Sequence, residues 1–182
     1  MANEQIERTG QVTFKGKPMT LVGPELKVGD KAPEFNLVDA DLQTMSWNDL
    51  SADGSKAVLL ILIPSIDTSV CSLETGKFNR HVANLPSDKV KTVVISADTP
   101  FAQKRWAIKE QVNNLQLLSD HKRKEFADAF GVHMKELGLL ARAIYLVDKD
   151  RTIRYIQTVS EVATEPDYDA VLKATRDLVG SS

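Results

Sequence analysis

Residues 57–63 read AVLLILI and residues 90–96 read VKTVVIS, and these two stretches decide the fold. Both are nearly continuous aliphatic runs, and neither alternates apolar with polar side chains. This pattern is typical of the central strands of a parallel sheet, which helices cover on both faces. Between them, apolar residues recur at roughly helical spacing within residues 69–85. The segment therefore predicts a strand, a helix and a second, parallel strand in succession.

The rest of the chain supplies shorter elements on both sides of this unit. Turn-prone residues 15–18 separate two short strand-like stretches, which predicts a β-hairpin at about residues 12–22. Further elements are expected as a strand at 35–38, a short helix at 47–50, a helix at 101–110, a strand at 115–118, a helix at 122–130, a hairpin of strands 143–147 and 153–159, and a helix at 167–178. This order predicts a thioredoxin-like α/β fold, with a mixed central sheet flanked by helices and an N-terminal β-hairpin, in a single domain spanning residues 1–182.

Charge and hydropathy exclude several classes of partner. The 182 residues include 23 Lys and Arg against 25 Asp and Glu, so no basic excess is present to neutralise a nucleic-acid backbone. The longest wholly apolar run, residues 57–63, is far shorter than the roughly 20 residues of a membrane-spanning helix. The polar and acidic first ten residues do not resemble a secretory signal, so we expect a cytoplasmic protein.

The count of cysteines is equally restrictive. Cys71 is the only one, which excludes an intramolecular disulfide and a cysteine-rich metal site. His81, His121 and His133 are scattered without metal-ligand spacing, and no glycine-rich phosphate-binding string occurs. We therefore expect neither a metal nor an organic cofactor.

Cys71 lies where a strand leads into a helix. The strand ends before Pro64, and if Asp67 or Thr68 caps the helix, Cys71 falls in its first turn. Unpaired N–H groups and the positive end of the helix dipole favour a thiolate there. The alternative is an inert, buried cysteine on the apolar face of a helix, which is a common situation for free cysteines.

The residues around Cys71 resemble a known signature. Pro64, Thr68 and Cys71 stand in the spacing Pro-x-x-x-Thr-x-x-Cys of peroxiredoxins, and the longer string PSIDTSVC at residues 64–71 is similar to the thiol peroxidase subfamily, the atypical two-cysteine group. The similarity continues in ISADTPFAQKRW at 95–106, LLSDH at 117–121, LLARAIYLVD at 139–148 and TEPDYDA at 164–170.

The resemblance implies a thiol-dependent peroxidase that serves antioxidant defence and reduces hydrogen peroxide and organic hydroperoxides without metal or flavin. Cys71 would be the peroxidatic nucleophile and would become a sulfenic acid. Thr68 would hydrogen-bond to the sulfur and the peroxide, Pro64 would shield the pocket, and Arg142 would point its guanidinium at the cysteine. Thioredoxin or another thiol would reduce the sulfenic acid, and the protein would be a homodimer.

One position departs from the subfamily. A resolving cysteine is expected in a string like Arg-Phe/Trp-Cys, and this chain has Ala107 after Arg105 and Trp106. Two explanations stay open: a natural one-cysteine variant that uses an external thiol, or a deliberate replacement of cysteine by alanine.

Two other functions are alternatives to the peroxidase. A thiol–disulfide oxidoreductase needs Cys-x-x-Cys, whereas Cys71 is followed by Ser, Leu and Glu74. A redox sensor or binding module without turnover would be oxidised once, so counting turnovers with dithiothreitol as donor distinguishes it from an enzyme.

Overall fold

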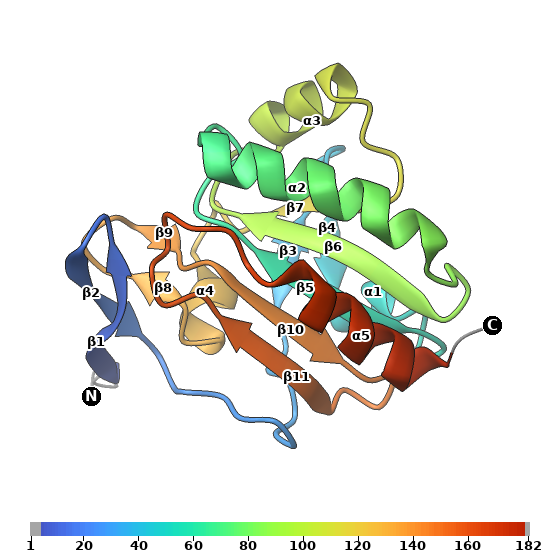
Figure 1. Cartoon of the computed structure of the whole chain (residues 1–182), viewed down its shortest axis with the longest axis horizontal. Coiled ribbons are helices and arrows are strands. Elements are labelled where there is room, and N and C mark those ends of the chain that lie inside the picture. The colour runs from blue at the N-terminus through green and yellow to red at the C-terminus, as the bar shows by residue number, and fades with distance from the viewer. Residues whose placement is uncertain (1–4, 181–182) are drawn as a thin grey trace.

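The computed structural model describes residues 5–180, so the first four and last two residues of the predicted domain lie outside it. A seven-stranded sheet forms the centre, in the strand order β11-β10-β5-β6-β7-β3-β4 (Figure 1). Its strands are β3 (Asn36–Val38), β4 (Thr44–Ser46), β5 (Ala57–Leu62), β6 (Val90–Ser96), β7 (Gln116–Ser119), β10 (Ala143–Val147) and β11 (Ile153–Thr158). Strands β5, β6 and β7 are parallel, and the remaining pairs are antiparallel. The predicted mixed sheet is confirmed.

Helices cover both faces of this sheet (Figure 1). They are α1 (Trp47–Leu50), α2 (Ser69–His81), α3 (Pro100–Lys109), α4 (Glu125–Ala129) and α5 (Tyr168–Val179). Side chains of β5 alternate between two cores: Leu59 and Ile61 pack with α2 and α5, whereas Leu60 and Leu62 pack with α1 and α4. This alternation explains why the β5 sequence is apolar at every position.

The N-terminal hairpin is longer than predicted and belongs to a second sheet. Strands β1 (Glu7–Phe14) and β2 (Lys17–Val22) are joined by Lys15 and Gly16, which both have positive φ, as a two-residue turn requires. Strand β2 then pairs with β8 (His133–Met134), and β8 pairs with β9 (Leu139–Leu140), giving the order β1-β2-β8-β9. Strands β4, β8 and β9 were not predicted, because two or three residues are too few to show a period.

Two predicted helices are shorter in the structure. Residues 69–85 form α2 only as far as His81, and a 3₁₀ turn, Val82–Asn84, follows. The helix expected at 122–130 is only α4, because Lys124 has a left-handed backbone and interrupts the run before Glu125. Buried Asp120 accepts hydrogen bonds from the N–H groups of Phe126 and Ala127 instead. Across residues 5–180, every helix is too short or too polar to cross a bilayer.

Candidate active site

The site begins where β5 ends. Pro64 is buried just beyond β5, and Thr68 is the N-cap of α2. Its Oγ1 accepts a hydrogen bond from the Cys71 N–H at 3.2 Å and donates to the carbonyl of Ser65 at 3.1 Å. Of the two caps expected from the sequence, Thr68 is therefore the one used. Cys71 lies in the first turn, and its side chain is fully buried.

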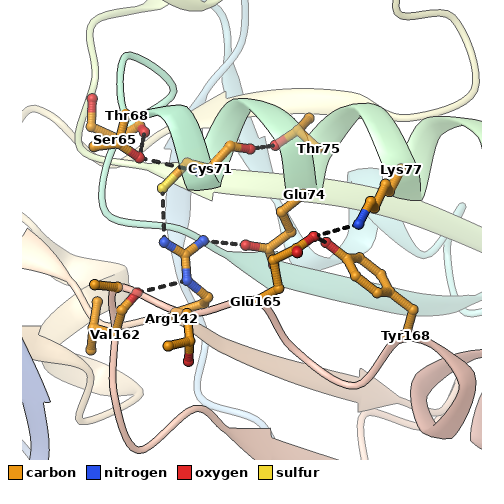
Figure 2. Close-up of polar contacts among 12 residues, drawn as sticks. Ser65, Thr68, Cys71, Glu74, Thr75, Lys77, Arg142, Val162, Glu165 and Tyr168 are labelled. Carbon is orange, nitrogen blue, oxygen red and sulfur yellow. Dashed lines mark hydrogen bonds and ion pairs between the residues drawn. The ribbon is translucent and has the colours of Figure 1, made fainter.

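Arg142 approaches Cys71 from the neighbouring strand. It directly precedes β10, and Ala143 at the start of β10 pairs with Leu62 at the end of β5. This register brings the arginine to the edge of the sheet at which α2 begins. Its Nη2 lies 3.2 Å from Cys71 Sγ. Figure 2 draws this contact as a dashed line. The orientation that the family resemblance implied is therefore present in the structure.

Two further contacts fix the guanidinium. Nε donates to the carbonyl of Val162 at 2.9 Å, and Nη1 contacts the carboxylate of Glu74 (Figure 2). Arg142 is 2% exposed and Glu74 is 0% exposed, so water screens neither charge. Because both other edges of the guanidinium are held, Nη2 is aimed at the sulfur.

Burial and charge act on this pair in opposite directions. Burial disfavours the charged guanidinium, but Glu74 and Cys71 together raise the pKa of Arg142 above its ordinary value. Burial raises the pKa of Glu74 to about 7, although Arg142 opposes the change. Arg142 is therefore a permanent cation beside the sulfur, whereas Glu74 changes charge near neutral pH.

The Thr68 hydroxyl is bound to backbone groups in the structure. Within the described residues, its hydrogen bonds go to the backbone of Ser65 and Cys71, and the sulfur receives its hydrogen bond from Arg142. The threonine thus fixes the turn that positions Cys71. Pro64 is buried beside this turn and has no N–H to donate.

Sequence reasoning missed two residues that support the site. Glu74 follows Cys71 by three positions, where its sequence context shows only that the second cysteine of Cys-x-x-Cys is absent. Asp98 accepts hydrogen bonds from Ser65 Oγ at 2.6 Å and from the Ile66 N–H at 2.7 Å, which anchors the loop before α2. Asp98 lies in the ISADTP string, which could have marked it as part of the site. Its partner loop lies about 30 residues away in sequence, so the contact itself could not be predicted.

Ala107 lies on α3, next to the helix that carries Cys71. Trp106 Nε1 donates to Ser72 Oγ at 3.1 Å, so α3 and the first turn of α2 are in direct contact. Ala107 is half-buried and packs against the core on the α2 face of the sheet. Position 107 therefore lies on the helix that contacts the first turn of α2, and its own side chain is inert.

The three histidines are engaged elsewhere. His133 Nδ1 lies 2.7 Å from an Asp128 carboxylate oxygen, and His121 Nδ1 lies 2.9 Å from Ser119 Oγ. The ring of His81 is 6.0 Å from that of Tyr168. Within residues 5–180, no three His, Cys, Asp or Glu side chains are grouped as they would be around a metal ion.

A thioredoxin-like sheet with a buried thiol at a helix N-terminus, facing an arginine, defines a peroxiredoxin-type enzyme. The AhpC/TSA family model matches residues 28–156. The thiol peroxidase of Listeria innocua is 48% identical, covering 91% of this chain and 98% of the relative, and that of Bacillus subtilis is 43% identical, covering 93% and 98%. A peroxiredoxin-like protein from Aquifex aeolicus superposes with a TM-score of 0.86 at 38% identity, covering 97% of this chain and 100% of the other. The chain therefore belongs to the AhpC/TSA family, and it is a thiol-dependent peroxidase.

Proposed function

We propose that Cys71 is the peroxidatic nucleophile and that hydrogen peroxide and organic hydroperoxides are its substrates. The observation that carries this assignment is the 3.2 Å contact between Arg142 Nη2 and Cys71 Sγ in a site closed to water. A cation at this distance favours the thiolate, which is the reactive form of cysteine. The N-terminal turn of α2 acts in the same direction.

The reaction is a two-electron transfer from sulfur to peroxide. The thiolate attacks one peroxide oxygen, an S–O bond forms as the O–O bond breaks, and the departing oxygen takes the electron pair and then a proton. The products are water or an alcohol and Cys71 sulfenic acid. Arg142 supports this step because its guanidinium can stabilise the charge that develops on the departing oxygen.

The sulfenic acid must then be reduced by a thiol from outside the chain, because the sequence holds no second cysteine. We infer that thioredoxin or another thiol forms a mixed disulfide with Cys71 and releases water, and that a second thiol restores the cysteine. Since Cys71 is fully buried, the first turn of α2 must open before that thiol can reach the sulfur.

The experiment that tests this proposal combines turnover with mass spectrometry. One equivalent of peroxide should add one oxygen atom to Cys71, and the C71S variant should lose peroxide turnover with either dithiothreitol or thioredoxin as donor. Asp67→Asn, which alters an exposed residue four positions before Cys71, serves as a matched control and should retain turnover. Turnover by C71S at the wild-type rate would refute the assignment, and so would a single oxidation event without further turnover in the wild type.

We also propose a homodimer that forms over α2 and α3. Leu73 on α2 and Phe101 and Ile108 on α3 are large apolar side chains exposed at 48%, 68% and 70%, and the Trp106–Ser72 hydrogen bond holds the two helices together. Sedimentation analysis should give twice the chain mass for the wild type and a smaller species for Phe101→Asp. A wild-type monomer at micromolar concentration would refute the dimer.

We further propose that the chain forms one domain over residues 1–182 and acts in the cytoplasm. One core contains residues from the N-terminal hairpin to Val162, the other contains residues from β5 to α5, and both include side chains of β5, which supports a single cooperative unit. A reducing compartment suits a catalytic thiol that must return to the reduced state. A single unfolding transition and recovery in the cytoplasmic fraction would support these two proposals; two transitions or recovery outside that fraction would refute them.

A further inference from the structure

Glu74 has an unusual environment for a carboxylate. It lies one helical turn after Cys71 on the buried face of α2, with 0% exposure. One carboxylate oxygen contacts Arg142 Nη1, whereas Oε1 has no hydrogen-bond partner among the described residues. An ionised carboxylate with one unpartnered, buried oxygen is energetically costly. The protonated carboxyl group is therefore stabilised relative to the carboxylate.

Arg142 is shared by two acids. Its Nη2 faces the sulfur of Cys71 and its Nη1 faces Glu74, so one positive charge serves a thiol and a carboxyl group at once (Figure 2). If both acids were ionised, the buried group would carry a net negative charge, whereas ionisation of only one leaves it neutral. Because uncompensated charge is strongly disfavoured in a buried site, the two ionisations oppose each other.

Among the residues that the structure describes, Glu74 has no ion pair with a second cation. Glu165, from the segment between β11 and α5, carries a negative charge that raises the pKa of Glu74 further, in the same direction as burial. The Lys77 ammonium on α2 is bound to Glu165 at 2.8 Å, and the Tyr168 hydroxyl on α5 donates to Glu165 at 2.7 Å. His81, near the end of α2, packs against the ring of Tyr168. Arg142 is thus the cation that both Glu74 and Cys71 contact.

We propose that Glu74 is a positioning residue that accepts a proton when the Cys71 thiolate forms. The positive charge of Arg142 then compensates the thiolate instead of the carboxylate. In this exchange the thiol loses its proton and the carboxylate gains one, without oxidation of either group. The unionised carboxyl group still holds Nη1 in place through an oxygen lone pair. The proposal rests on the proposed function, because it assigns a role at the site where Cys71 acts as nucleophile.

The first test follows thiolate formation by its ultraviolet absorbance as a function of pH, without peroxide. Glu74→Gln keeps the shape and the acceptor for Nη1 but removes the competing charge. The pH midpoint of thiolate formation should therefore fall by roughly one unit relative to wild type. Asp67→Asn is the matched control: it removes an exposed carboxylate near the same helix end, where solvent screens the charge, so its shift should be much smaller. An unchanged or higher midpoint in Glu74→Gln would overturn the proposal.

The second test measures the protonation of the Glu74 carboxyl group itself. The infrared carbonyl band of a protonated carboxylic acid, assigned by its loss in Glu74→Gln, should persist to higher pH in the wild type than in Cys71→Ser. The coupling between the two acids acts in both directions, so the Cys71 thiolate disfavours ionisation of Glu74. The serine variant has no thiolate, and Glu74 should therefore lose its proton at lower pH. Equal midpoints, or no assignable band at any pH, would overturn the proposal. If Cys71→Ser kept full peroxide turnover, the proposed function would fail, yet these two titrations would still report whether the acids are linked.

Discussion

Arg142 and Cys71 are 71 positions apart in sequence, yet Nη2 of the arginine lies 3.2 Å from Sγ of the cysteine. The contact exists because β10 runs antiparallel beside β5, and α2 begins just beyond the end of β5. The same arginine compensates a buried carboxylate, so its removal affects both chemistry and stability.

Replacement of Arg142 by methionine should slow sulfenic acid formation by about 100-fold, as the loss of one donor to developing charge does in other enzymes. The single variant also leaves Glu74 buried without its cation, which lowers stability. The double variant Arg142→Met with Glu74→Gln avoids that unpaired charge. Stopped-flow kinetics should show the same slow reaction in the double variant, together with a recovered melting temperature. A fast reaction in either variant would contradict the role of Arg142.

Thr68→Val should reduce the free energy of unfolding by about 1 kcal/mol, because it removes the acceptor for the Cys71 N–H at the N-cap. It should also slow the reaction with peroxide, since the turn that holds the sulfur loses its anchor to Ser65. Thr68→Ser is the control, because it keeps the hydroxyl. Urea denaturation and peroxide kinetics measure the two effects, and equal behaviour of the two variants would contradict the capping role.

The pH dependence of stability should carry a contribution from Glu74. Burial raises its pKa from 4.5 to about 7, so between these pH values the folded state retains a proton that the unfolded state has released. The free energy of unfolding therefore falls as pH rises through this window, by up to about 3 kcal/mol for this group. Glu74→Gln should lose that slope and become the more stable protein above pH 7. Denaturation curves at several pH values provide the measurement, and parallel curves for the two proteins would argue against it.

Asp98→Asn should weaken the loop that precedes α2. Both carboxylate oxygens accept hydrogen bonds, from Ser65 Oγ and the Ile66 N–H, and an amide can replace only one acceptor. We expect a loss of about 1–3 kcal/mol in the free energy of unfolding and slower oxidation of Cys71. Asp88→Asn, at an exposed position, is the control. The prediction fails if the two variants unfold at the same urea concentration.

Ala107→Cys should give the chain an internal resolving thiol. The Trp106–Ser72 hydrogen bond places α3 against the first turn of α2, so a cysteine at 107 lies on the helix next to Cys71. One equivalent of peroxide should then yield a disulfide in place of a stable sulfenic acid, and thioredoxin-dependent turnover should rise. Lys109→Cys, at an exposed position two residues further along α3, should form little of this disulfide. Thiol counting and peptide mapping distinguish the outcomes, and no gain in turnover would favour a natural one-cysteine cycle.

Most helices and strands of the fold could be predicted from local sequence patterns. The predicted strands at β6 and β10 agree with the structure at both ends, and β5 differs by one residue, because continuous aliphatic runs are a strong signal for covered strands. The shortest strands were not predicted: β8 and β9 have two residues each, β8 is a strand because it pairs with β2, distant in sequence, and β9 because it pairs with β8. The start of α4 depended on the left-handed backbone at Lys124, which no periodicity reveals.

The sequence by itself determined the local half of the site. Pro64, Thr68 and Cys71 act through a turn and a helix cap, and hydrogen bonds between residues three positions apart are encoded in their spacing. Only the tertiary structure decided that Arg142 and Glu74 meet. A glutamate on a helix with exposed neighbours such as Leu73 looks like a surface residue until β10 and the segment after β11 close over it. Burial, which sets the charge of Glu74, is a property of packing between distant segments, and for that reason the sequence alone did not reveal it.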